Sequence, residues 1–114
     1  MNLPALLSRI RAFRDERDWG QFHNPKDMAA ALAIEAAELQ EIFLWKTGEE
    51  IASTAKRKKT EIEEEVADIA VYLLEFADNL GIDIEAAILA KLGKNAAKYP
   101  VDKAKGSSAK YTDL

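Results

Sequence analysis

Residues 28–39, MAAALAIEAAEL, and residues 65–74, EVADIAVYLL, decide the fold of this chain. Each stretch places two carboxylates three residues apart in an otherwise apolar run: Glu35 and Glu38 in the first, Glu65 and Asp68 in the second. Residues three apart lie on one face of an α-helix, with Cβ atoms about 5–6 Å apart. The two stretches therefore predict two apolar helices, each with a pair of acidic side chains on one face.

Helical periodicity continues on both sides of these stretches. It predicts helices over residues 3–13, 25–45, 61–80 and 83–98, with residues 14–20 closing the first and residues 21–24 as a loop. The expected N-terminal caps are Asn2, Asn24, Asp83 and a capping box of Thr60 with Glu63. Residues 49–59 form either a separate short helix or an extension. No segment alternates with period two, so we expect an all-α antiparallel bundle of four to five helices.

The length of 114 residues predicts one domain, which we place at residues 1–100. Residues 101–114 have no period and several lysines, which favours a frayed, basic C-terminal tail. A flap that orders over a ligand is the alternative. With 48% hydrophobic residues and a thin core, the bundle is expected to be completed by oligomerisation.

The charge is unevenly distributed along the chain. Residues 1–90 hold 10 basic and 18 acidic side chains, whereas residues 91–114 hold six lysines and two aspartates, for a net charge of −4. An acidic chain repels the phosphates of a duplex, so no nucleic-acid partner is expected. A small anion bound at the basic end is still allowed, because local charge governs local binding.

Two classes of protein are excluded by composition. Cysteine is absent, which rules out disulfides and thiol chemistry. The longest apolar run, residues 28–34, is far short of the roughly 18 residues that a membrane helix needs. Since residues 1–11 also lack a leader pattern, we expect a cytoplasmic protein with no membrane partner.

Four carboxylates between two helices repel one another and lose solvation, so they require either protons or a cation. Oxygen ligands without cysteine select hard ions, which predicts Mg²⁺, with Mn²⁺ possible. A di-iron site is a weak alternative because the sole histidine, His23, lies outside these helices. A solvated acidic stripe is the other alternative. A Mg²⁺ site near a lysine-rich segment suggests phosphoryl chemistry on a nucleotide-like anion.

The pattern of Glu35-x-x-Glu38, 26 residues, then Glu65-x-x-Asp68 resembles the metal-binding signature of the MazG-like all-α nucleoside triphosphate pyrophosphohydrolases. Four further blocks resemble the dCTP pyrophosphatase branch of that family: residues 17–23, RDWGQFH; 43–46, FLWK; 95–100, NAAKYP; and 110–114, KYTDL. One departure is Ile34, where the general MazG pattern has a second glutamate directly before the first ligand.

The resemblance implies Mg²⁺-dependent hydrolysis of a nucleoside triphosphate to the monophosphate and pyrophosphate, with attack at the α-phosphorus. The substrate would be dCTP or a modified cytosine nucleotide, and the role nucleotide-pool sanitation. Glu35, Glu38, Glu65 and Asp68 would hold the metal. One of these carboxylates, or a metal-held hydroxide, would activate water, with Glu38 and Glu65 as the catalytic candidates. Members of this kind form homodimers or homotetramers with shared sites.

The resemblance also implies substrate-binding residues: Trp19, His23, Trp45, Tyr72, Lys91, Asn95 and Tyr99. Aromatic rings can stack on a nucleobase, an asparagine can pair with its edge, and a lysine can meet phosphate. For Trp45 and Tyr72 the alternative is a place in the core. For His23 it is a hydrogen bond within a loop.

The sequence allows two other functions. One is a non-catalytic helical interaction module, in which the apolar helices form an oligomer interface. The other is a related pyrophosphohydrolase that acts on dUTP or phosphoribosyl-ATP. The four carboxylates are the feature that distinguishes an enzyme from the interaction module. A panel of nucleotide substrates distinguishes the related pyrophosphohydrolases from one that acts on dCTP.

Overall fold

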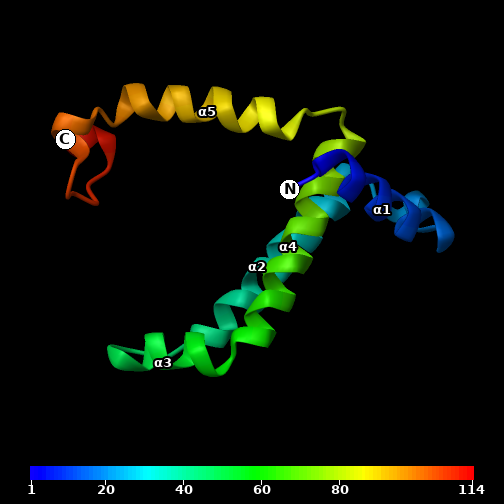
Figure 1. Cartoon of the computed structure of the whole chain (residues 1–114), viewed down its shortest axis with the longest axis horizontal. Coiled ribbons are helices and arrows are strands. Elements are labelled where there is room, and N and C mark those ends of the chain that lie inside the picture. The colour runs from blue at the N-terminus through cyan, green and yellow to red at the C-terminus, as the bar shows by residue number, and fades with distance from the viewer. The chain divides into compact units, whose positions relative to one another are not determined.

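The computed structural model describes residues Met1 to Leu114 and contains only helices, which confirms the all-α class (Figure 1). Their order is α1 (Leu3–Glu16), η1 (Trp19–Phe22, 3₁₀), α2 (Pro25–Phe43), α3 (Glu49–Arg57), α4 (Lys59–Asn79), α5 (Ile84–Lys98), α6 (Val101–Ala104) and η2 (Tyr111–Asp113, 3₁₀). The chain forms two compact units, Met1–Gly81 and Ile82–Leu114. One domain over residues 1–100 with a tail from 101 stays a prediction.

The first unit is built on the antiparallel pair of α2 and α4, which lie side by side along their length (Figure 1). These two helices contain the apolar stretches quoted above, and they bury part of that surface against each other. Helix α1 packs against α4 near its C-terminal end, and α3 contacts both α2 and α4 at the opposite end. The α2–α4 pair is therefore the centre of the first unit, with α1 packed at one end and α3 at the other.

Three of the expected N-terminal caps are confirmed. The side chains of Asn2, Asn24 and Asp83 accept hydrogen bonds from backbone N–H groups three residues on, at 3.1, 2.9 and 3.0 Å. The capping box of Thr60 is wrong. Helix α4 begins at Lys59, with Lys58 as its N-cap and no side-chain cap bond, because α3 ends only two residues earlier and the backbone turns directly from one helix into the next.

Three segments differ from the expectation. Residues 49–57 form a separate helix, α3, which settles the alternative left open by the periodicity. Helix α1 runs to Glu16, and the expected loop is replaced in part by η1, which begins after Asp18 in the left-handed conformation at φ 55°. The segment expected to be an unstructured tail contains the short helices α6 and η2.

The second unit consists of α5, α6 and η2. The Tyr99 and Tyr111 rings make an edge-to-face contact with centroids 6.0 Å apart, and Lys98 Nζ lies 4.9 Å from the centre of the Tyr111 ring. No side chain of these three helices is buried. The apolar side chains of Ile88 and Leu89 on α5 are 51% and 62% exposed.

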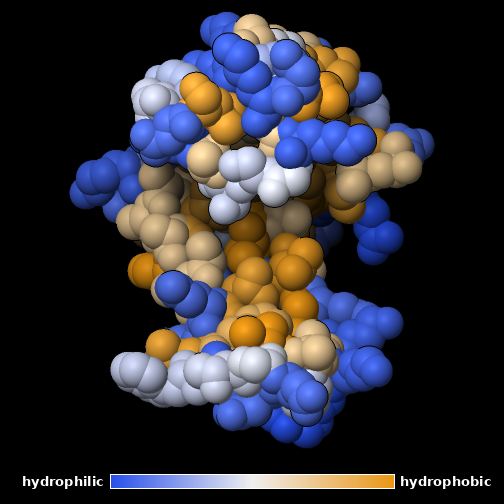
Figure 2. Space-filling model, turned by 90° about the vertical axis from the view of Figure 1, so that its left-hand side faces the viewer, coloured by the Kyte–Doolittle hydropathy of each residue, from blue (hydrophilic) through white to orange (hydrophobic).

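The first unit also has a thin core. Its buried side chains are Ile10, Met28, Thr54, Glu75 and Ala77. Apolar side chains reach the surface along α2 and α4, where Figure 2 shows them gathered in the middle of the view. Ile34, Val66 and Leu73 are among them. No helix of the structure is both long enough and apolar enough to span a bilayer.

Met28 is the largest side chain that is almost fully enclosed, at 2% exposed, so its truncation should be costly. We expect Met28→Ala to lower the free energy of unfolding by about 2–5 kcal/mol, because a cavity remains where the side chain was. Urea unfolding at one protein concentration measures this. The control Lys26→Ala, at a side chain 90% exposed, should change stability by less than about 0.5 kcal/mol. Equal effects would show that α2 is not anchored at Met28.

Candidate functional site

Helices α2 and α4 bring three carboxylates together. Glu35, Glu38 and Glu65 each offer one oxygen, and these oxygens all lie within 4.8 Å of one another. Glu35 and Glu65 are half-buried, and Glu38 is exposed. Oε2 of Glu35 and Oε2 of Glu65 are buried without any hydrogen-bond partner. Buried polar atoms without a partner are costly, and the chain itself supplies no donor to either of these two oxygens.

The cluster shifts the protonation of its own members. Burial, together with the neighbouring carboxyls of Glu38, Asp68 and Glu65, raises the pKa of Glu35 from 4.5 to about 7. Burial and the carboxyl of Glu38 also raise the pKa of Glu65. Without a cation, the folded chain therefore retains a proton in the cluster at a pH where an ordinary carboxyl has lost it.

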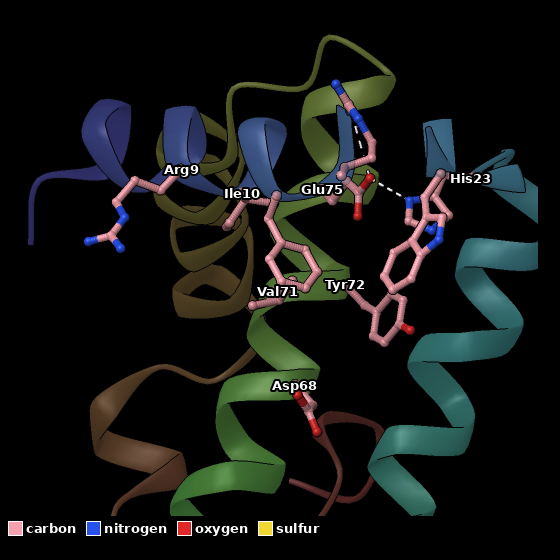
Figure 3. A pocket seen from close by; sticks show the side chains of 10 residues that line it. Arg9, Ile10, His23, Asp68, Val71, Tyr72 and Glu75 are labelled. Carbon is pink, nitrogen blue, oxygen red and sulfur yellow. Dashed lines mark hydrogen bonds and ion pairs between the residues drawn. The ribbon is translucent and has the colours of Figure 1, made fainter. Parts of the chain in front are cut away.

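Beside the cluster lies a cavity of about 420 Å³ (Figure 3). One part of its lining is apolar or aromatic: Ile10, Phe13, Trp19, Val71 and Tyr72. The other part is polar or charged: Arg9, Arg14, His23, Asp68 and Glu75. Asp68 lines the cavity, and its charge also acts on Glu35 and Glu65. The cavity and the acidic cluster are therefore adjacent along α4.

Trp19, in η1, forms an aromatic wall of the cavity. Its ring meets Phe13 edge to face, with centroids 5.8 Å apart, and lies 6.3 Å from the ring of His23. The guanidinium of Arg17 lies 3.7 Å from the centre of the Phe13 ring. Trp19 is 43% exposed, so its ring retains free surface on which a planar ligand can stack.

A buried carboxylate that the sequence analysis missed lies at one end of the cavity. Glu75 is 3% exposed, and His23 Nδ1 lies 2.6 Å from its Oε1. Arg14 Nη1 lies 3.7 Å from the same oxygen. A sequence signal for Glu75 exists, because it follows Tyr72 by three residues and interrupts an apolar stretch of α4.

The comparisons with known proteins agree with this geometry. Residues 30–114 match the MazG-like family. The chain belongs to that family. A solved pyrophosphatase from Archaeoglobus fulgidus DSM 4304 is similar in structure to this MazG-like chain, with a TM-score of 0.84 and 42% identity over 88% of this chain and 94% of that one. The resemblance to the MazG-like family is thereby confirmed.

Curated relatives of this MazG-like chain include dCTP pyrophosphatase 1 from two mammals. The Bos taurus protein is 42% identical and the Homo sapiens protein 39% identical, each over 111 residues and 95% of this chain. The chain spans 66% and 65% of the length of these two relatives. The name dCTP pyrophosphatase 1 states the activity of these two relatives.

The expected site residues fall into three groups in this MazG-like chain. The structure brings Glu35, Glu38 and Glu65 into one cluster, while Asp68 lies outside it, in the lining of the adjacent cavity. Among the expected substrate-binding residues, those that line the cavity are Trp19, His23 and Tyr72. Those of the second unit are Lys91, Asn95 and Tyr99, and their role stays a prediction.

Trp45 is a separate case. It follows α2 with a positive φ of 66°, and its side chain is 88% exposed. A place in the core of this chain is therefore wrong for Trp45, and it does not line the cavity. Tyr72 is half-buried and lines the cavity, where burial and nearby carboxyls raise its pKa. The loop alternative for His23 is partly right, because its ring bonds Glu75 while it also lines the cavity.

The donor set of this MazG-like site fits a hard divalent cation. All donors of the cluster are carboxylate oxygens, and two of them are buried and unpaired. Ions such as Mg²⁺ prefer oxygen ligands and are often held by one or two carboxylates together with substrate phosphates. Glu35, Glu38 and Glu65 are therefore the residues that could hold it.

The raised pKa of Glu35 predicts a pH dependence of stability. Between pH 4.5 and about 7 the folded chain retains a proton that the unfolded chain has lost, so without metal the free energy of unfolding should fall as pH rises through this window. Asp15 and Asp78 act oppositely, but their lowered pKa values confine their effect to pH below about 3.8. Thermal unfolding with a chelator, from pH 5 to 8, measures the slope.

Two variants and the addition of Mg²⁺ test the origin of this dependence of stability on pH. Glu35→Gln should reduce the slope, since an amide does not titrate in this range, and the raised pKa of Glu65 should account for what remains. Glu63→Gln, on the exposed surface of α4, should leave it unchanged. Millimolar Mg²⁺ should raise the Tm of the wild type at pH 8 through linkage, but not that of Glu38→Ala. An unchanged slope in Glu35→Gln would contradict the proton assignment.

Proposed function

We propose that this chain is a Mg²⁺-dependent nucleoside triphosphate pyrophosphohydrolase that converts dCTP or a modified cytosine nucleotide to the monophosphate and pyrophosphate. The observation that carries the proposal is the acidic cluster of α2 and α4, with two unpaired buried oxygens, directly beside a cavity with aromatic walls. Relatives named dCTP pyrophosphatase 1 and a related pyrophosphatase structure support it.

The roles of the acidic residues follow from their placement. Glu35, Glu38 and Glu65 would hold Mg²⁺, with Asp68 one helical turn beyond Glu65 as the further ligand. The chemistry that the ion supplies is neutralisation of phosphate charge at the reacting phosphoryl group. Glu38 and Glu65 are the proposed bases, one of which accepts a proton from the attacking water, and Glu38 is the exposed member of the cluster.

The reaction is a hydrolysis at the α-phosphorus. An oxygen of water bonds to the α-phosphorus, the bond from this phosphorus to the oxygen that bridges to the β-phosphorus breaks, and pyrophosphate leaves with that oxygen. The carboxylate that took the proton releases it to solvent afterwards. In H₂¹⁸O the label should therefore enter the monophosphate and not pyrophosphate.

The cavity is proposed as the site of the nucleobase. Its volume, about 420 Å³, lies within the range of roughly 300–1,000 Å³ that is usual for small-molecule pockets. Trp19 and Tyr72 provide rings for stacking, which is sequence-tolerant because every base has a π-face. Trp45, Lys91, Asn95 and Tyr99 are proposed as further substrate-binding residues, with Lys91 meeting phosphate and Asn95 pairing with polar atoms.

The proposal predicts release of pyrophosphate from dCTP with Mg²⁺ and little release with a chelator. Glu38→Gln should lower kcat/KM by at least about 100-fold, because a cation ligand and a candidate base are lost together. Glu63→Gln removes an exposed carboxylate from α4 and should retain the wild-type rate. A coupled pyrophosphate assay measures all three proteins.

The first product released, pyrophosphate or orthophosphate, shows which phosphoanhydride bond of the triphosphate is cleaved. Orthophosphate as the first product would contradict attack at the α-phosphorus. Full activity in Glu38→Gln would contradict the role of the cluster. Faster turnover of dUTP or phosphoribosyl-ATP than of dCTP would move the substrate to a related nucleotide and leave the reaction type unchanged.

The exposed apolar side chains support a homo-oligomer as part of this proposal. Ile34 and Val66 in the first unit, and Leu89 in the second, are each about half exposed or more, at 60%, 49% and 62%. Large apolar surfaces on a soluble protein are typically covered by a partner. A second copy of this chain is the partner that we propose, in a homodimer or a homotetramer.

The mass of the particle in solution tests the assembly. Light scattering after gel filtration should give two or four times the chain mass at micromolar concentration. The same mass is expected for Glu38→Gln, which would separate assembly from catalysis. A single-chain mass for the active wild type would contradict the proposed homo-oligomer. Assembly without pyrophosphate release from any nucleotide would favour the interaction module.

A further inference from the structure

The two oxygens of the Glu75 carboxylate have different environments. Oε1 has a hydrogen-bond partner in His23 Nδ1 at 2.6 Å and an ion-pair partner in Arg14 Nη1 at 3.7 Å. Oε2 has no hydrogen-bond donor from the chain. Unlike the unpaired oxygens of Glu35 and Glu65, it is not fully enclosed. Figure 3 shows this second oxygen directed away from His23, on the side of Tyr72 and Val71.

A carboxylate oxygen with this position can accept a hydrogen bond from a molecule in the cavity. Glu75 is 3% exposed and lines the cavity, so the space that Oε2 can reach is the cavity itself. Burial of a charged acceptor without a hydrogen bond is costly, and hydrogen bonds to charged groups are stronger than those between neutral groups. A ligand that donates a hydrogen bond at this end of the cavity would therefore be favoured over one that presents only lone pairs.

Glu75 is held in place by a network. Arg14 Nη1 also donates to Asn79 Oδ1 at 2.9 Å, and Arg14 Nε donates to Asp15 Oδ1 at 2.8 Å. Asn79 Nδ2 donates to the backbone oxygen of His23 at 3.4 Å. The carboxylate is thus tied to α1 and to the segment before α2, so it cannot turn away freely from an unsuitable ligand.

We propose that Glu75 is a specificity-determining residue that selects nucleotides whose base carries an exocyclic amino group, through a hydrogen bond from that group to Oε2. This inference rests on the proposed function, which places the base in the cavity. Carboxylates are suitable acceptors for the amino group of cytosine. The 4-oxo oxygen of uracil at the same place could not donate a hydrogen bond. This oxygen and Oε2 of Glu75 would then both remain unpaired.

The matched pair dCTP and dUTP tests the proposal, because the two nucleotides differ in the base only at position 4 and the adjacent ring nitrogen. The wild type should have a kcat/KM for dCTP at least about tenfold above that for dUTP, the scale expected for one well-placed hydrogen-bonded contact. dATP and dTTP extend the comparison: turnover of dATP above dTTP would support selection of the amino group itself, and equal turnover would contradict it.

Glu75→Gln is the decisive variant. Its amide oxygen can still accept from His23, which leaves the NH₂ group at the position of Oε2, where it donates instead of accepts. The ratio of dCTP to dUTP turnover should fall by about tenfold or more, mainly through a lower KM for dUTP. A role in folding alone would change both nucleotides equally. Asp78→Asn is the matched control, since Asp78 lies on the same helix, pairs with Arg11 and does not line the cavity.

A binding measurement separates this inference from the proposed function. Calorimetry of the wild type with dCMP and dUMP, without metal, requires no catalysis and should show tighter binding of dCMP. Absence of pyrophosphate release from every nucleotide would defeat the proposed function, while the dCMP preference would still support the role of Glu75. Equal affinity for the two monophosphates in the wild type would overturn the proposal whether or not Glu75→Gln folds, and so would an unchanged ratio in a folded Glu75→Gln.

Discussion

Mutual repulsion among the carboxylates between α2 and α4 is the constraint on which the rest of the structure depends. Antiparallel packing of the two apolar helices brings Glu35, Glu38 and Glu65 within 4.8 Å of one another, and part of their oxygen surface is removed from water. The helices cannot separate to relieve this repulsion without exposing the apolar surface that joins them. The site is therefore a consequence of helix packing: the fold holds together acidic groups that, without a counter-charge, would repel one another.

One face of α4 connects the parts of the site. Glu65, Asp68, Tyr72 and Glu75 follow one another at steps of three and four residues, which places them in a row along that face. Along this row lie a member of the acidic cluster, an acidic side chain shared with the cavity, an aromatic wall, and a buried acceptor at the far end. A rigid helix keeps these distances constant, as binding of a nucleotide from its phosphates to its base would require.

The sequence predicted the local features well and the long-range ones poorly. Spacing identified both apolar helices, three of the four caps and the acidic residues, since each depends on neighbours within one or two turns. It failed where partners are distant: Glu75 bonds to His23 52 residues away, and Arg14 reaches Asn79 65 residues away. Thr60 failed as a cap because the preceding helix ends too close to it. Trp45 is exposed and has a positive φ just after α2, and helical periodicity reveals neither property.

The absence of buried side chains in residues 82–114 has a consequence for how the chain is degraded. Helices without an interior of their own open at low energetic cost, and a protease cleaves such segments first. Amide protons of α5 should accordingly exchange with solvent faster than those of α2 and α4 whenever the apolar side of α5 is left uncovered. The lifetime of the chain in the cell would then depend on whether a partner covers α5. Scarce or unassembled chains would be removed sooner than abundant ones.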